Sequence, residues 1–278
     1  MAYSAEIGRL NPGCFLILID QSGSMADVQA TSGVQKAQGA SDAVNRVLAD
    51  LVIRCTKQEG VRDYFHVGVI GYGSSVQPAL AGALSGRDLV PISEIADLPS
   101  RVDERMRRES DGAGGVVDVP TRLPIWLEPV AEGGTPMCES LKLARSALNG
   151  WVVSHETSFP PVVINLTDGE ATDGDPLGPA QELVGLHTKD GEVLLFNCHI
   201  SSQKAQPVLY PDSESGLADD YAKRLFRMSS ILPERVRAIA SQEEHNITES
   251  SRGFVFNADI ADLVKFLDIG TRVSTDLR

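Results

Sequence analysis

The chain of 278 residues is 42% hydrophobic and 23% charged, which is the balance of a soluble globular protein. Its formal net charge of −13 opposes contact with a phosphate backbone, so nucleic acid is not an expected partner. No segment approaches the roughly 18 apolar residues of a membrane span, and residues 1–10 carry neither the basic nor the apolar region of a secretion signal. We therefore expect a cytoplasmic protein that does not bind membranes.

The cysteines support the same compartment. None of the four, which are Cys14, Cys55, Cys138 and Cys198, belongs to a Cys-x-x-Cys pair, and three of them lie in or beside apolar segments. Such a pattern is typical of buried, reduced thiols and not of a zinc site or a disulfide framework.

The first part of the chain predicts a strand, a helix and a second strand. The apolar run Phe15–Ile19 stops abruptly at Asp20, as expected of a strand that is buried on both faces of a parallel sheet. Apolar residues at helical spacing predict a helix from about Val34 to Lys57. The run Tyr64–Tyr72, which is closed by glycines, predicts the next strand.

Residues 74–132 form the least regular stretch. Proline and glycine punctuation predicts an edge-strand excursion with a short helix and a glycine-rich tip at "DGAGG", residues 111–115. A second interpretation is a ligand-facing insert above a metal crevice. We expect Arg105, Arg107 and Arg108 to form a solvated helix face and not an anion site.

The later part of the chain resumes the alternation of strands and helices. An apolar run that ends at Asp168 predicts a buried strand, and "EVLLFNCHI" over Glu192–Ile200 predicts another. The remaining predicted elements are a short strand at Phe254–Phe256 and helices at Met137–Asn149, Asp175–Lys189, Gly216–Met228, Pro233–Gln242 and Ala258–Arg272. This alternation predicts an α/β fold with a doubly wound, mostly parallel central sheet flanked by helices. We expect a single domain over residues 1–278.

Oxygen-bearing side chains gather at three predicted strand-to-helix turns. Asp20, Ser22 and Ser24 follow the first strand, Thr135 lies in the glycine turn "EGGTP", and Asp168 ends a later strand. The carboxyl ends of parallel strands open onto the crevices where ligands bind. A carboxylate with two hydroxyls suits a hard cation such as Mg²⁺. The alternative, from the residues alone, is a capped turn in which Asp20 or Ser22 accepts hydrogen bonds from the next helix.

These segments resemble the von Willebrand factor type A (vWA) domain family. The metal-ion-dependent adhesion site of that family uses Asp-x-Ser-x-Ser, a later Thr and a later Asp, which here are Asp20, Ser22, Ser24, Thr135 and Asp168. The wording "DQSGSM", "GGTP" and "LTDGEATDGD" is similar to bacterial, intracellular A domains, including those associated with tellurite-resistance and stress operons. The resemblance is weak over about 76–130 and 201–232, which we expect to be insertions.

The resemblance implies a binding site and not a catalytic one. In such a site Ser22, Ser24 and, when a ligand is bound, Thr135 contact the metal directly, while Asp20 and Asp168 act mainly through water and orient the serines. The metal would be Mg²⁺, or else Mn²⁺ or Ca²⁺. One coordination position stays open for an Asp or Glu side chain of a partner protein.

Other polar residues receive simpler interpretations. We expect "DGEATDGD" to be a solvated acidic loop in which Asp175 caps the following helix, because the EF-hand spacing and its terminal Glu are missing. His66 and His199 fall in apolar strands, and we expect both to be core residues with satisfied hydrogen bonds.

Two further functions stay open as alternatives. Haloacid-dehalogenase-like phosphotransferases also place an aspartate nucleophile at a strand end beside Mg²⁺. In that interpretation Asp20 is the nucleophile. Its supporting residues are Thr135 as the small hydroxyl, Lys142 as a phosphate clamp, and Asp168 with Asp173 as the acids that bind the metal. That family needs a second Asp two residues after the nucleophile, but this chain has Ser22, which cannot transfer a proton at neutral pH. The other alternative is an adaptor with a vestigial site or a purely structural metal. We expect no enzymatic activity.

Overall fold

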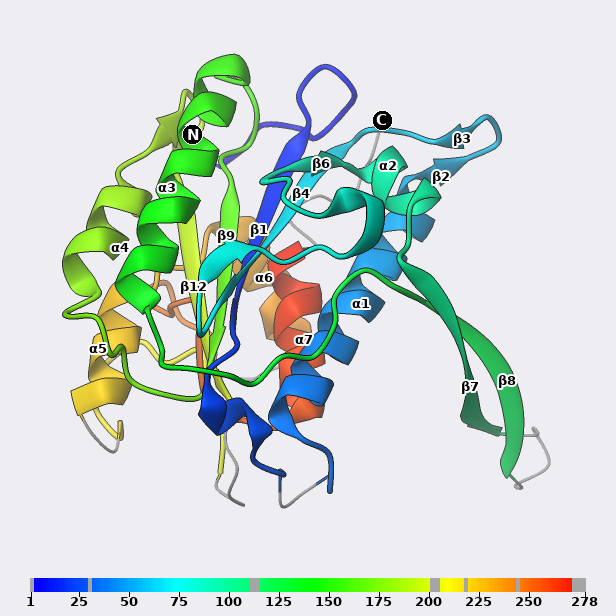
Figure 1. The fold of residues 1–278 in the computed structure, drawn as a ribbon. Coiled ribbons are helices and arrows are strands. Elements are labelled where there is room, and N and C mark those ends of the chain that lie inside the picture. The colour runs from blue at the N-terminus through cyan, green and yellow to red at the C-terminus, as the bar shows by residue number, and fades with distance from the viewer. Residues whose placement is uncertain are drawn as a thin grey trace.

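A central sheet organises the protein. The computed structural model describes residues 3–29, 32–110, 116–200, 206–217, 220–243 and 246–271. Within these residues the main sheet has eight strands (Figure 1). Its parallel strands, in spatial order, are β14 (Phe254–Ala258), β12 (Leu194–Ile200), β9 (Val162–Thr167), β1 (Gly13–Asp20) and β4 (Phe65–Tyr72). The prediction of a mostly parallel α/β sheet is confirmed.

Short antiparallel strands complete both edges of the sheet. On one edge β13 (Val208–Leu209) pairs with β14. On the other, β5 (Val76–Pro78) and β6 (Val90–Pro91) pair with β4. Both stretches that were expected to be insertions therefore contribute strands to the main sheet.

Helices cover both faces of the sheet, because the central strand is apolar on both sides. All of β1 is buried, with Phe15 and Ile17 in one hydrophobic cluster and Leu16 and Leu18 in the other. The first cluster includes residues of α1 (Lys36–Cys55), α2 (Ile92–Asp97), α6 (Glu234–Glu243) and α7 (Ile260–Thr271). The second includes residues of α3 (Met137–Ser154), α4 (Leu177–Val184) and α5 (Asp220–Met228), which lie together in Figure 1.

One of the predicted helices ends well before its predicted last residue. The helix expected over Asp175–Lys189 is the shorter α4, and the chain then forms a small hairpin of β10 (His187–Thr188) and β11 (Gly191–Glu192). The hairpin turns at Lys189 and Asp190. Asp190 and Gly191 form an Asp-Gly pair, which favours a turn over a helix. A second small hairpin, of β2 (Thr56–Lys57) and β3 (Gly60–Val61), follows α1 directly.

The arginine-rich run is a strand, so the prediction of a solvated helix face is wrong. β7 (Arg101–Ser110) pairs antiparallel with β8 (Val116–Ile125) along its whole length. The valines of β8 favour a strand, and pairing with β8 outweighs the local preference of the charged run. This hairpin projects from the body beside α1 (Figure 1), where Arg105 Nη1 donates to Asp42 Oδ2 at 2.7 Å. The glycine-rich tip, residues 111–115, lies outside the described residues.

His66 and His199 are half-buried, and both have hydrogen-bond partners as predicted. His66 Nδ1 accepts a hydrogen bond from Trp151 Nε1 at 3.1 Å, and His199 Nδ1 accepts one from the Asn257 backbone at 3.3 Å. The four cysteines are free and buried. Among the described helices, none combines the length and apolar character needed to cross a bilayer.

Candidate metal centre at the carboxyl edge of the sheet

Asp20 is the buried anchor of the site. The last residue of β1, it is 1% exposed, and its two carboxylate oxygens accept hydrogen bonds from the Ser22 backbone and the Thr167 hydroxyl, each at 2.8 Å. Burial raises the pKa of Asp20 to about 6, although the hydrogen bonds from Ser22 act in the opposite direction. A cation bound nearby would oppose this effect of burial and favour the charged form of the Asp20 carboxyl group.

The hydroxyls of Ser22 and Ser24 lie close together in the turn that follows Asp20. The short 3-10 helix η1 (Gly23–Ala26) follows β1 and turns the chain so that the Ser22 and Ser24 hydroxyl oxygens are 3.0 Å apart. Ser24 also donates a hydrogen bond to Asp168 Oδ1 at 2.7 Å. Ser22 is buried whereas Ser24 is exposed, so the pair reaches from the interior to solvent.

Thr135 joins the same group from the second turn. Thr135 is 5% exposed, and within the described part of the chain its hydroxyl makes no hydrogen bond. A Cβ atom placed on Gly169 would lie 3.7 Å from the Thr135 hydroxyl oxygen and 3.9 Å from that of Ser24. The hydroxyls of Thr135 and Ser24 therefore both face the glycine that follows Asp168.

Backbone hydrogen bonds hold the three turns together. Gly23 N donates to Gly133 O at 3.0 Å, which joins the first turn to the second. The second and third turns are joined through Thr135 N, which donates to the Thr172 hydroxyl at 3.0 Å, and Thr172 N, which donates to Thr135 O at 2.9 Å. Gly133 has φ +85°, and a Cβ there would lie 2.5 Å from Ser74 N. Glycine is therefore required at this point of the turn.

A lysine that the sequence reasoning missed completes the site. Lys36 Nζ lies 2.5 Å from Asp168 Oδ2 and 3.4 Å from Asp27 Oδ2. The side chains of Lys36 and Asp168 are 4% and 0% exposed. Lys36 is the first residue of α1, where the helix dipole disfavours a cation. That unfavourable position is the signal in the sequence that sets this lysine apart.

The acidic loop after Asp168 is partly structural. Asp175 Oδ1 accepts from the backbone N of Leu177, the first residue of α4, at 3.2 Å, but the N-cap position itself is occupied by Pro176 and not by Asp175 as predicted. Asp173 was not expected to cap a helix, but it accepts from Cys138 N at 3.1 Å and from Glu139 N at 2.9 Å. Asp173 thus fixes the start of α3 directly after the Thr135 turn. Lys142, the phosphate clamp of the phosphotransferase alternative, is exposed on α3.

Hydroxyl groups outnumber carboxylates in the candidate metal centre. Among the described residues, no cluster of three or more His, Cys, Asp and Glu side chains is placed to hold a metal ion. The predicted set instead comes together as two buried carboxylates with three hydroxyls, namely Asp20, Asp168, Ser22, Ser24 and Thr135. Oxygen atoms of this kind are ligands for hard cations.

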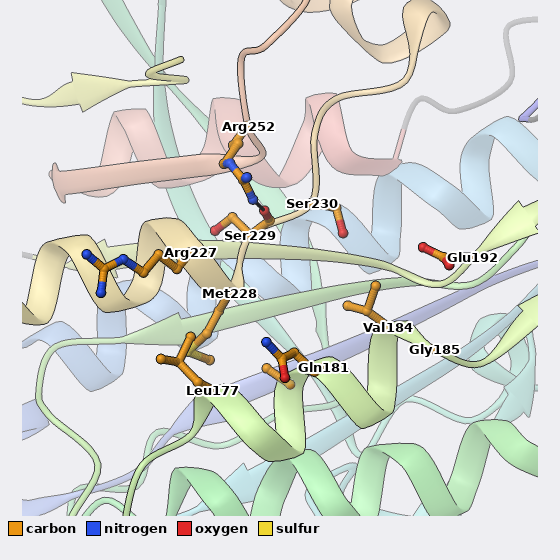
Figure 2. A pocket seen from close by; sticks show the side chains of 11 residues that line it. Leu177, Gln181, Val184, Gly185, Glu192, Arg227, Met228, Ser229, Ser230 and Arg252 are labelled. Carbon is orange, nitrogen blue, oxygen red and sulfur yellow. Dashed lines mark hydrogen bonds between the residues drawn. The ribbon is translucent and has the colours of Figure 1, made fainter. Parts of the chain in front are cut away.

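A separate pocket of about 240 Å³ lies between α4, the end of α5 and the segments that carry Glu192 and Arg252 (Figure 2). Its two arginines have partners already. Arg227 donates to both carboxylate oxygens of Glu214, at 2.7 and 2.8 Å, and Arg252 donates to Ser229 O at 2.6 Å. None of the residues that line this pocket belongs to the candidate metal centre.

Comparison with known proteins gives matches to solved structures at low sequence identity. No family model matches the sequence, and neither does any curated protein. The pilus adhesin SpaC of Lactobacillus rhamnosus GG is 16% identical with a TM-score of 0.48, and the match covers 93% of this chain and 30% of that one. The ArnB paralog VWA2 of Sulfolobus acidocaldarius is 12% identical with a TM-score of 0.42, over 92% of this chain and 44% of that one.

Manganese-loaded TRAP of Plasmodium vivax is 15% identical with a TM-score of 0.34, and the match covers 68% of this chain and 57% of that one. The vWF domain of the pilus tip protein Mfa5 of Porphyromonas gingivalis is 17% identical with a TM-score of 0.34, over 58% of this chain and 39% of that one. The chain thus spans less than two thirds of each of these four structures. None of their names concerns tellurite resistance, and that expected link stays a prediction.

The chain has an α/β fold with a mostly parallel central sheet. Its own sheet order places β1 at the centre of a parallel sheet, between β9 and β4. The three motif-bearing turns come together at the carboxyl edge of that sheet, as the sequence pattern predicted.

Proposed function

We propose that the protein is a metal-dependent binding module that captures an acidic side chain of a partner protein. The observation that carries this proposal is the convergence of Ser22, Ser24 and Thr135 hydroxyls beside two buried carboxylates. A divalent ion, Mg²⁺ or else Mn²⁺ or Ca²⁺, would be held by these hydroxyls, with Asp20 and Asp168 orienting them. When bound, the ion would supply an electrophile for an Asp or Glu carboxylate.

The spacing of the hydroxyls supports such an ion. The Ser22 and Ser24 hydroxyls share a hydrogen bond with their oxygens 3.0 Å apart. The same separation fits two neighbouring ligands of an Mg²⁺ octahedron, which lie about 3 Å apart when the bonds are about 2.1 Å. Ser24 is exposed, which leaves a route from solvent. Few direct carboxylates keep the ion electrophilic, and this favours ligand capture over a purely structural metal.

The remaining parts of the proposal concern catalysis, location and partner. No catalytic role is assigned, because Ser22 replaces the acid that a phosphotransferase needs and Asp173 caps α3 instead of facing the site. Four buried free thiols support a cytoplasmic location. With a net charge of −13, the protein favours a partner that is neutral or basic around its docking carboxylate.

Calorimetric titration with Mn²⁺ or Mg²⁺ tests the site. The wild type should bind one ion, and Ser24→Ala should bind at least about tenfold more weakly because it loses a direct ligand. The exposed Ser85, which directly follows the 3-10 helix η2 (Gly82–Leu84), provides the matched control, and Ser85→Ala should bind like the wild type. Equal affinity in both variants would remove the assigned site.

Partner capture needs a second experiment. Tagged protein incubated with cell lysate should retain a partner in Mg²⁺ and lose it in chelator, and Ser24→Ala should retain none. Retention that ignores both chelator and mutation would favour the adaptor with a vestigial site.

A further inference from the structure

We propose that Lys36 sets the charge of this metal centre and makes it selective for anionic ligands. The inference rests on the function proposed above and adds a role for a residue outside the motif. In this role the ammonium group weakens the binding of the divalent ion. In return, it leaves the loaded centre with a net positive charge.

The first step is that Lys36 belongs to the site. Lysine is almost never fully buried unless it is paired, yet this side chain is 4% exposed and contacts a carboxylate that is 0% exposed. The other oxygen of the same carboxylate accepts from Ser24. One carboxylate therefore links the ammonium group to a proposed metal ligand.

The second step is that Asp168 is the principal partner of this ammonium group. Asp27 is farther away, at 3.4 Å against 2.5 Å, and its side chain is 62% exposed. Solvent weakens an exposed ion pair far more than a buried one. The positive charge of Lys36 is therefore directed at the site and not at the surface.

The third step is a count of charges. Asp20 and Asp168 as carboxylates contribute two negative charges and Lys36 contributes one positive charge, so the empty group carries about one negative charge. A divalent ion changes the net charge of Asp20, Asp168 and Lys36 from about one negative charge to about one positive charge, which one carboxylate of a partner neutralises. Without Lys36 the loaded centre would be neutral, and it would attract an anion less strongly.

Calorimetry on full-length variants tests the metal side of this role. Lys36→Met keeps the length of the side chain and removes its charge. It should bind Mn²⁺ at least about tenfold more tightly than the wild type, because a positive charge close to the ion is removed. Lys142→Met removes the same charge from an exposed site on α3 and should stay within about twofold of the wild type.

Acetate titrated into Mg²⁺-saturated protein tests the anion side. Acetate should bind the wild type at least about fivefold more tightly than Lys36→Met. Lys36→Arg, which keeps the charge, should stay close to the wild type in both titrations.

The outcomes separate this inference from the function on which it rests. If Ser24→Ala loses Mn²⁺ binding while Lys36→Met binds it no more tightly than the wild type, Lys36 is merely structural and the inference is overturned. If the wild type binds no Mn²⁺ at all, the proposed function fails and the inference fails with it. Should Lys36→Met be too unstable for calorimetry without metal, saturating Mn²⁺ must raise its thermal midpoint more than it raises that of the wild type. An equal or smaller rise overturns the inference.

Discussion

At the scale of single residues, the candidate metal centre depends on how its charges are buried. Asp20 is held by two hydrogen bonds at the end of β1, and Asp168 lies between the Ser24 hydroxyl and the Lys36 ammonium group. Each carboxylate therefore has partners before any ion arrives. A buried charge without a partner would cost several kcal/mol, so this arrangement allows the site to exist without metal.

Gly169 tests whether the hydroxyls converge as described. Gly169→Ala would place a methyl group 3.7 Å from the Thr135 oxygen and 3.9 Å from that of Ser24. These are ordinary contact distances, so the free energy of unfolding should change by less than about 1 kcal/mol. Mn²⁺ should nevertheless bind at least about fivefold more weakly, because the methyl group crowds the ligands.

Gly178→Ala is the matched control, since a Cβ on this glycine of α4 would meet no atom within 4 Å. Calorimetry and urea denaturation measure both variants. Undiminished Mn²⁺ affinity in Gly169→Ala would mean that the ion does not lie between these hydroxyls.

His66 predicts how stability depends on pH. Burial, and secondarily the nearby His155, lower the pKa of His66 below its ordinary value of about 6.5. Its ring also accepts from Trp151, which a protonated Nδ1 cannot do. Below about pH 6.5 the unfolded chain therefore binds more protons here than the folded chain, so the free energy of unfolding should fall as the pH falls.

Urea denaturation at about pH 7 and about pH 5.5 measures this dependence. His66→Gln keeps an acceptor for Trp151 and should lose part of the pH dependence, whereas His187→Gln, at an exposed position, should keep all of it. An identical pH dependence in wild type and His66→Gln would contradict the assignment.

At the scale of elements, α3 connects the stability of the fold to the Thr135 turn. Asp173 accepts hydrogen bonds from the first amides of this helix, and α3 begins two residues after Thr135. Asp173→Ala should lower the free energy of unfolding by about 1 kcal/mol, as loss of a helix cap does. It should also weaken Mn²⁺ binding, because the turn loses its support.

Asp175→Ala provides the comparison for this variant. Asp175 makes a single longer hydrogen bond, to Leu177 N, and lies at an exposed position. Its removal should leave Mn²⁺ affinity unchanged. Equal effects of the two variants on Mn²⁺ would show that Asp173 acts through general charge and not through α3.

The β7–β8 hairpin is the element that the main sheet needs least. It forms its own two-stranded sheet, and Ser100 N donates to Ile125 O at 2.8 Å, so the ends of the hairpin already meet. Replacement of residues 102–124 by a short Gly/Ser linker should cost less than about 1 kcal/mol, since it removes exposed ion pairs such as Arg122 with Glu104 and one half-buried pair, Arg105 with Asp42. Mn²⁺ affinity should stay within about twofold.

Circular dichroism and calorimetry check this deletion. An unfolded product would contradict the independence of the hairpin. Loss of the partner in the pull-down, with Mn²⁺ binding intact, would instead support the interpretation of this segment as a ligand-facing insert.

The hairpin also illustrates what local sequence could and could not predict. Continuous apolar runs identified β1 and β9, because burial on both faces demands such runs. The arginine-rich run has no such pattern, and its conformation is set by pairing with β8 across the glycine-rich tip. Lys36 escaped prediction for a similar reason, since its partner Asp168 is 132 residues away in sequence.

At the scale of the whole molecule, two hydrophobic layers hold the sheet in place, and the site is an edge of that sheet. The side chains of β1 alternate between both layers, so the position of Asp20 is fixed by the core and not by the loops around it. A ligand that binds the native state alone raises the free energy of unfolding by about 2.7 kcal/mol at a hundredfold excess over Kd. Metal bound at this edge should therefore stabilise the entire domain.

The most direct test is the anomalous diffraction of a crystal grown in Mn²⁺. The proposed function predicts a single strong peak in contact with the hydroxyl oxygens of Ser22 and Ser24, beside Thr135 and Gly169. A peak confined to the acidic loop around Asp173 and Asp175, or none at a concentration that saturates the protein in solution, would contradict it.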